Sequence, residues 1–114
     1  MPFINVKTNV KLSEEKKEAV KNDLADSISV IPGKSDRYLM TAVEDGISMA
    51  FHRDSGSAMA MVEVKIFGSS TKDAYGRLTG EICRILGDVA GIDGQNCYVK
   101  FEEVKYWGYN GFMF

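Results

Sequence analysis

The segment AMAMVEVKIF, residues 58–67, alternates small or branched apolar side chains with a more mixed set. Ala60, Val62, Val64 and Ile66 fall at every second position, and polar Glu63 lies among the residues between them. Because successive side chains of a strand point to opposite faces, this alternation predicts a strand with one aliphatic face and one mixed face. It is the clearest strand signal in the chain.

Toward the amino terminus, residues 3–8 also alternate and predict a half-buried strand, which places Pro2 at its first position. Ser13 is positioned to cap a following helix, and the acidic residues 14–15 suit its first turn. The apolar stripe of this helix is Val20, Leu24, Ile28 and Ile31, at helical spacing. Pro32-Gly33 ends it.

Toward the carboxyl terminus the same order of elements recurs. Residues 37–44 are apolar on both faces, which predicts a central strand, followed by a turn at 45–46 and a short extended piece at 47–51. A second helix is predicted over residues 71–89, although Gly76 and Gly80 weaken it unless they permit close packing. Residues 97–104 predict another strand.

Strand, helix, strand therefore occurs twice, with the division near residue 55. The predicted fold class is α+β: two βαβ units joined into one four-stranded mixed sheet, with both helices on one face, in a single domain over residues 1–114. The other face, expected to carry Met59, Met61 and Tyr98, would then need a second subunit to cover it. The tail, residues 106–114, holds five aromatic residues, and we expect it to dock on a neighbouring subunit or border a pocket, the alternative being that it folds back on its own chain.

Composition excludes several classes of protein. The formal charge of −2 gives no basic footprint, so we expect no nucleic-acid partner. Cys83 and Cys97 lack the spacing of a zinc or redox pair, and with a single histidine, His52, we expect no metal and interpret both cysteines as reduced, largely buried thiols. No segment reads as a signal peptide or a membrane span, which predicts no membrane association and a cytoplasmic location.

Pro2 offers a chemical group that no other position offers. If Met1 is removed, the ring nitrogen becomes a secondary amine at the chain terminus, which can act as a base when burial and nearby cations disfavour its protonated form. The alternative is an ordinary proline at the start of a strand, where no N–H is needed.

Several short motifs resemble the macrophage migration inhibitory factor family of the tautomerase superfamily, in order and along essentially the whole chain. The resemblance implies a homotrimer with active sites at subunit boundaries. It also implies cofactor-free tautomerisation of aromatic α-keto acids such as phenylpyruvate, and of D-dopachrome-type substrates. The segments that carry it are Met1-Pro2, Thr8-Asn9-Val10, Gly33-Lys34 with Tyr38, Met49-Ala50-Phe51, Ile66, Tyr98 and the tail Trp107–Phe114.

The resemblance also implies roles for individual residues. Pro2 would be the catalytic base, Lys34 would hold the substrate carboxylate, and the backbone N–H of Ile66 would supply a neutral donor. Tyr98 from a neighbouring subunit would contact the substrate or tune Pro2. The aromatic walls would be Tyr38, Tyr109 and Phe114. Without the resemblance, Lys34 reads as a solvated lysine and Tyr98 as an interface aromatic.

Four departures from the family pattern bear on the site. Lys100 stands where an asparagine is common, so a second cation is expected to reach the site unless it points to solvent. Phe67 and the pair His52-Arg53 replace glycines, and Tyr109 replaces the usual tryptophan, so pocket shape and substrate preference are expected to differ. The family's cysteine pair is missing from residues 58–61, which predicts no thiol–disulfide activity.

Three other functions compete with this prediction. One is a cytokine-like signalling protein, released without a signal peptide and bound by a protein receptor, in which the tautomerase pocket is incidental. Another is a small ferredoxin-like ligand sensor, which shares the βαβ repeat but gives no reason for Pro2, Lys34 and Tyr98 to occur in register. The dehalogenase and decarboxylase branches of the superfamily rely on arginines, and the arginines of this chain show no matching pattern.

Overall fold

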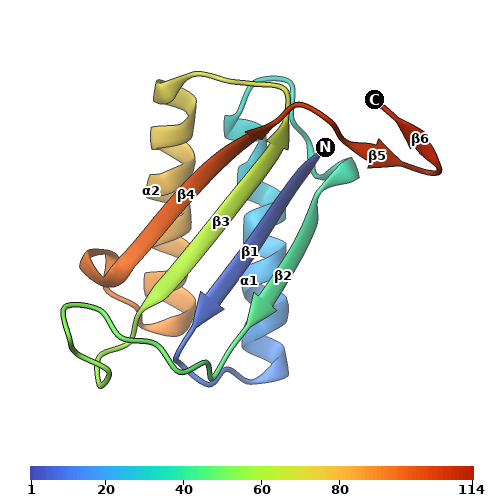
Figure 1. Cartoon of the computed structure of the whole chain (residues 1–114). Helices are drawn as coiled ribbons and strands as arrows, with labels where there is room; N and C mark the ends of the chain where they lie inside the picture. The colour runs from blue at the N-terminus through green and yellow to red at the C-terminus, as the bar shows by residue number, and fades with distance from the viewer.

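A computed structural model describes residues 1–114 and shows one four-stranded sheet with two long helices on one face (Figure 1). The sheet has the order β2-β1-β3-β4, so the predicted α+β fold class is confirmed. The elements of this layer are β1 (Pro2–Thr8), α1 (Glu14–Ser27), β2 (Met40–Glu44), β3 (Ala60–Phe67), α2 (Lys72–Ala90) and β4 (Cys97–Val104).

The pairing of the strands brings three chain segments to one end of the sheet. β1 runs parallel to β2 and antiparallel to β3, and β3 runs parallel to β4. The start of β1 therefore lies beside the ends of β3 and β4, with Pro2 opposite Ile66. Figure 1 shows the chain's N-terminus at this end, next to the carboxyl-terminal tail.

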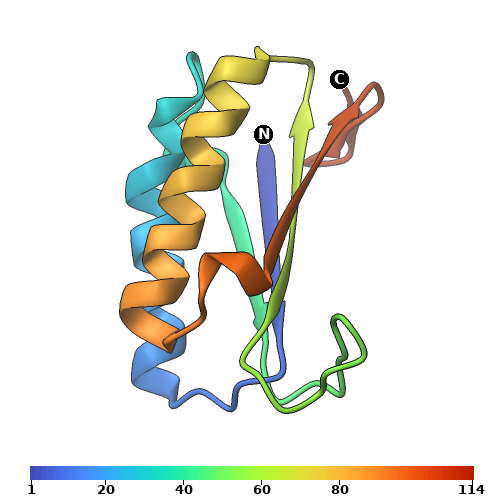
Figure 2. The same ribbon diagram turned by 90° about the vertical axis from the view of Figure 1, so that its left-hand side faces the viewer.

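The core lies between the sheet and the two helices, which cover the same face when the sheet is seen edge-on (Figure 2). Ile4, Val64 and Ile66 reach it from the sheet, and the predicted helical stripe is fully buried. The helix itself ends earlier than predicted, at Ser27, so Ile28 lies in a 3₁₀ turn (Ile28–Val30) and Ile31 follows that turn. Burying an aliphatic side chain of this size contributes about 1.5–3 kcal/mol, so these strictly alternating positions fix the register of β1 and β3. Ser13 caps α1 by accepting a hydrogen bond from the Lys16 N–H at 3.1 Å.

Two predictions about β2 are wrong. Residues 36–38 form a 3₁₀ turn, capped by Ser35, so the strand begins at Met40 instead of residue 37. β2 is also an edge strand of this sheet, since it pairs only with β1. Apolar residues of β2 therefore stay exposed near the tail, and Met40 is 68% exposed.

The face of the sheet away from the helices also differs from the prediction. Met59 is buried, lines a small cavity together with residues 49–51, and precedes β3, which begins only at Ala60. The centre of this face is polar and carries an ion-pair network that crosses β1, β3 and β4. Its members are Lys7, Glu63, Lys65, Lys100 and Glu102, joined at 3.0–4.0 Å.

The tail forms a small hairpin of its own, β5 (Gly108–Tyr109) with β6 (Phe112–Met113), beyond the end of the main sheet. It projects from the sheet (Figure 1), and Phe112 and Met113 are 73% and 68% exposed. The predicted extended piece at residues 47–51 is limited to a bridge between Phe51 and Asp54, which closes a tight turn through His52 and Arg53. None of the helices has the length and apolar character needed to cross a membrane.

Candidate active site

The amino terminus lies at the end of the sheet where β1 meets β3. Pro2 is buried, and the Phe67 N–H donates a hydrogen bond of 3.2 Å to the Met1 carbonyl. In an antiparallel ladder, hydrogen-bonded and non-hydrogen-bonded pairs alternate. Since Met1 and Phe67 form a bonded pair, the Pro2–Ile66 pair is non-bonded, and the Ile66 N–H points toward β4. The backbone donor that faces the chain terminus is therefore that of Phe67.

Lys34 lies beside the same terminus. It follows the turn that ends the first helical segment, and its Nζ donates a 3.0 Å hydrogen bond to the Phe67 carbonyl. The pKa of the Met1 α-amino group is lowered from its ordinary value, first because burial removes water from the ammonium and then because of the Lys34 charge. Both causes favour a neutral amine, the form that can accept a proton.

Three of the predicted wall residues come together around this terminus. The ring centroids of Tyr38 and Tyr109 lie 5.6 Å apart, edge to face, and those of Tyr109 and Phe114 lie 6.2 Å apart in a stack. The ring centroids of Phe114 and Phe67 lie 6.4 Å apart. A hydrogen bond from the Phe114 N–H to the Trp107 carbonyl, at 2.9 Å, holds the tail in this fold.

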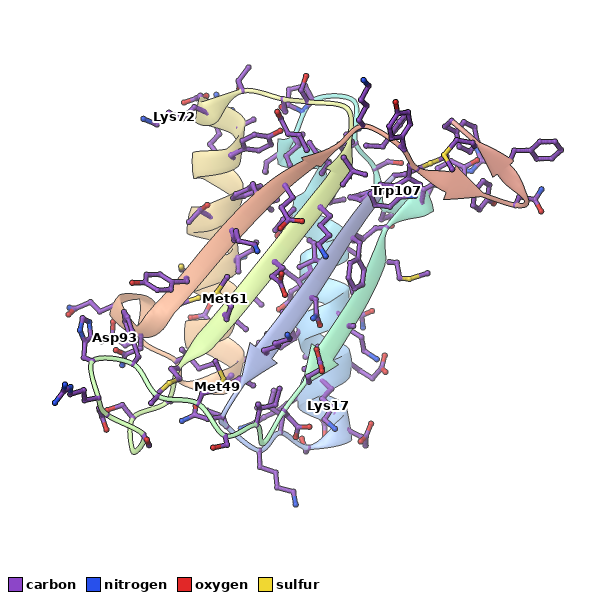
Figure 3. The ribbon with its side chains drawn as sticks, in the orientation of Figure 1. Lys17, Met49, Met61, Lys72, Asp93 and Trp107 are labelled. Atoms are coloured by element: carbon purple, nitrogen blue, oxygen red, sulfur yellow. The ribbon has the colours of Figure 1, made fainter.

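A cavity of about 670 Å³ opens next to Met1, on the face of the sheet away from the helices. Its volume lies within the range of small-molecule sites. Figure 3 shows Trp107 at this end of the sheet, where the tail leaves β4. The wall is mainly aromatic and aliphatic, and its members include Phe3, Tyr38, Leu39, Met40, Trp107 and Tyr109.

The remaining two predicted residues lie elsewhere in the chain. Tyr98 pairs with Met61, five residues from Ile66, which places it about 17 Å along the sheet from Pro2 at 3.3–3.4 Å per residue. The ring centroids of Tyr98 and Phe51 lie 4.9 Å apart, and Tyr98 is 61% exposed. Figure 3 shows Met61 toward that opposite end of β3, away from Trp107.

Lys100 is also remote from Pro2 and is held by two carboxylates. Its Nζ lies 3.0 Å from Glu102 and 3.4 Å from Glu63. These partners, Glu102 first, raise the pKa of Lys100. Within one chain, Lys34 and the aromatic wall thus lie at the end of the sheet where β1 begins, and Tyr98 and Lys100 lie apart from it.

Sequence reasoning missed three groups at this site: the Phe67 N–H, Trp107 and Arg37. The sequence marks Phe67 only as a large side chain in place of a family glycine. The alternation of a strand nevertheless predicts that the N–H groups of Ile66 and Phe67 point in opposite directions. Trp107 was grouped with the tail. Arg37 was assigned to a strand, but it lines the cavity, and its guanidinium lies 5.3 Å from the Tyr38 ring centroid.

Neither metal ligands nor a reactive thiol occur at this end of the sheet. No group of three or more His, Cys, Asp or Glu side chains is arranged to hold a metal ion. The two cysteines are free, partly buried and adjacent to each other, away from the terminus. Burial, followed by the proximity of Cys83, raises the pKa of the Cys97 thiol to about 12.

Comparison with known proteins gives one family and many similar folds. The family model described as Macrophage migration inhibitory factor (MIF) matches residues 1–114. Among solved structures, MIF2 from Leishmania major is 24% identical with a TM-score of 0.93, covering 100% of this chain and 97% of its own. The MIF-like protein from Entamoeba histolytica is 26% identical with a TM-score of 0.89, covering 99% and 98%.

A fused 4-OT described as a symmetric trimer is also similar in fold. It is 19% identical with a TM-score of 0.84, covering 96% of this chain and 94% of its own. A search of curated proteins gives no match.

Proposed function

The chain belongs to the macrophage migration inhibitory factor family, and on that premise we propose that it is a cofactor-independent isomerase, a keto–enol tautomerase of aromatic α-keto acids such as phenylpyruvate. Pro2 is its base once Met1 has been removed. The observation that supports this proposal is the Met1 α-amino group, which lies beside an aromatic cavity with its pKa lowered by burial and by Lys34. We expect the Pro2 amine, one residue further along the chain, to experience the same two effects once Met1 has been removed. We also propose that residues 1–114 act as one domain.

The reaction moves one proton and changes no oxidation state. The neutral Pro2 nitrogen removes a proton from the carbon next to the keto group, the electron pair of that C–H bond forms the enolate, and the enolate oxygen takes up a proton from water. The protonated Pro2 nitrogen gives its proton back to water, which restores the neutral base. Lys34 holds the carboxylate, since its Nζ has three donors and only one is bound to the Phe67 carbonyl. The aromatic wall receives the ring of the substrate.

Removal of Met1 also changes the donors at the site. The Phe67 N–H now donates to the Met1 carbonyl, and that carbonyl leaves together with Met1. The freed N–H then has no acceptor on β1, and we propose that it donates to the enolate oxygen, since such a donor stabilises an oxyanion. Ile66 was proposed for this role from sequence, and its neighbour Phe67 has the more suitable direction.

We propose that the protein assembles as a homotrimer, as in the trimeric relative of similar fold. If Tyr98 contacts the substrate, as the resemblance implies, it must do so at the terminus of another copy, because it lies about 17 Å from Pro2 within its own chain. The exposed apolar residues of the edge strand and of the hairpin supply surface for such contacts. Lys100 would reach a neighbouring site only by leaving its carboxylate partners.

The decisive experiment is phenylpyruvate tautomerisation by protein whose intact mass confirms loss of Met1, beside Pro2→Gly. This variant keeps a terminal amine and loses the secondary amine. Turnover that drops sharply in the variant supports the amino-terminal base. A processed, folded trimer without turnover refutes the tautomerase proposal and makes a signalling or interaction role the leading one.

A further inference from the structure

Arg37 is the only charged side chain that lines the cavity beside the amino terminus. Apart from Gly108, every other lining residue has an apolar or aromatic side chain, so Arg37 is the one charged side chain in an otherwise apolar wall beside the terminal amine. The backbone of Arg37 is fixed by the 3₁₀ turn at residues 36–38, in which the Ser35 side chain accepts the Arg37 N–H at 3.4 Å.

The guanidinium of Arg37 lies at the Tyr38 ring but has no carboxylate partner within this chain. It lies 5.3 Å from the centroid of the Tyr38 ring, an arrangement that holds the guanidinium plane and leaves its edge donors free. No carboxylate lies within 4.0 Å of it, whereas Arg77 and Arg84 on α2 both form ion pairs. A fork of unoccupied N–H donors beside an apolar wall suits a carboxylate carried by an aromatic ligand.

Lys34 and Arg37 serve different parts of the site. Lys34 donates to the Phe67 carbonyl beside the terminus and does not line the cavity. Arg37 lines the cavity, with its guanidinium next to the Tyr38 ring. If the keto-acid carboxylate is held by Lys34 and the ring enters the cavity, Arg37 is the only charged side chain of the wall that a second anionic group on the ring can meet.

We propose that Arg37 makes this pocket selective for aromatic α-keto acids that carry a second anionic group on the ring, distal to the keto acid. The proposal rests on the proposed function, because it takes the orientation of the substrate from Lys34. Arg37 is in this account a specificity-determining residue and takes no part in the proton transfer.

The first test compares kcat/KM for phenylpyruvate and for 4-carboxyphenylpyruvate at fixed ionic strength. The wild-type protein should prefer the dicarboxylate, and Arg37→Met should reduce that preference by about ten- to a hundredfold, the range for a charge-assisted hydrogen bond. Arg77→Met is the matched control, since Arg77 is an exposed arginine on α2 that pairs with Asp73 and does not line the cavity, and it should leave the ratio as in the wild type. A ratio that is the same in Arg37→Met and in the wild type overturns the proposal.

The second test needs no turnover and so separates the two proposals. Trp107 is the single tryptophan of the chain and lines the cavity, so quenching of its fluorescence reports binding there. Terephthalate should bind the wild type at least about tenfold more tightly than benzoate, and Arg37→Met should abolish this difference. If phenylpyruvate is not turned over but the difference is found, the proposed function fails and the assignment of Arg37 stands. An equal affinity for the two anions in the wild type overturns the assignment, whether or not the protein is a tautomerase.

Discussion

Replacing Lys34 by Met tests the proposed carboxylate-binding residue, and the expected fall in kcat/KM can be derived from the hydrogen bonds that the ammonium group makes. The Nζ of Lys34 has three donors, and one is bound to the Phe67 carbonyl at 3.0 Å, which leaves two for a carboxylate. A hydrogen bond to a charged group contributes about 1.5–3 kcal/mol, or roughly 10- to 150-fold at 1.4 kcal/mol per factor of ten. Met keeps a long unbranched stem and removes only the ammonium. We therefore expect kcat/KM for phenylpyruvate to fall by about 10- to 150-fold.

The same variant should change the pH dependence, in a direction that follows from the charge. Lys34 is one cause of the lowered pKa of the Met1 α-amino group, and we expect its charge to act in the same direction on the Pro2 amine, so its removal should raise the pKa of that amine. The neutral amine is the active base, and its fraction at a given pH falls when its pKa rises. The acid limb of the kcat/KM profile should therefore move to higher pH in Lys34→Met. A variant that only disturbed folding would lower the rate without this shift.

Lys16→Met is the matched control, because Lys16 is an exposed lysine on α1 that forms no ion pair. Thermal unfolding should show that both variants are folded, with a loss of about 1 kcal/mol in Lys34→Met from its one neutral partner. If Lys34→Met has the kcat/KM and the acid limb of the wild type, Lys34 neither binds the carboxylate nor tunes the amine, and the assignment is refuted.

Four further outcomes are expected. Gly80→Ala should stabilise the protein by up to about 1 kcal/mol in denaturant unfolding, because an added Cβ meets no atom within 4 Å, whereas Gly91→Ala, at φ +67°, should destabilise it. Thr8→Val should cost about 1–3 kcal/mol, since it leaves two buried backbone partners of the hydroxyl unsatisfied, while Thr8→Ser should restore most of this. Cys97 should react with iodoacetamide at pH 8 more than about a hundredfold more slowly than glutathione, measured by peptide mass, because its pKa is raised to about 12. Lys100→Asn should shift the KM for phenylpyruvate or the pH profile if Lys100 reaches a neighbouring site, and identical values would remove it from the site.

The alternation of β3 and the helical stripe of α1 could be predicted because each is a local pattern that one buried face imposes. Val62, Val64 and Ile66 are buried by the layer of helices, whatever the rest of the chain does. The position of β2 could not be predicted in this way. A strand that is apolar on both faces reads as central, and only the long-range pairing shows that Met40–Glu44 lies at the edge of the sheet.

The candidate site shows the same difference between residues that a local pattern or motif reveals and residues that only the folded structure reveals. The resemblance names Pro2, Lys34 and the wall residues Tyr38, Tyr109 and Phe114. The three aromatic rings contact one another and Lys34 lies near the Met1 amine, while the roles of these residues stay predictions. Arg37 could not be found in the sequence because its importance depends on a tail about seventy residues later that closes the cavity over it. Charge alone does not distinguish it from the other arginines, and its missing ion pair is visible only in three dimensions.

One cleavage prepares the proposed site in two ways. The bond between Met1 and Pro2 holds the proline nitrogen as an amide, which has no basic lone pair, and its carbonyl occupies the Phe67 N–H at 3.2 Å. Hydrolysis of that bond produces the secondary amine and removes the acceptor at the same time. The base and the oxyanion donor thus appear together, on neighbouring strands that the Pro2–Ile66 pairing holds in register. Protein that retains Met1 should therefore be less active than Pro2→Gly, in which the Phe67 N–H is free and only the nature of the amine has changed.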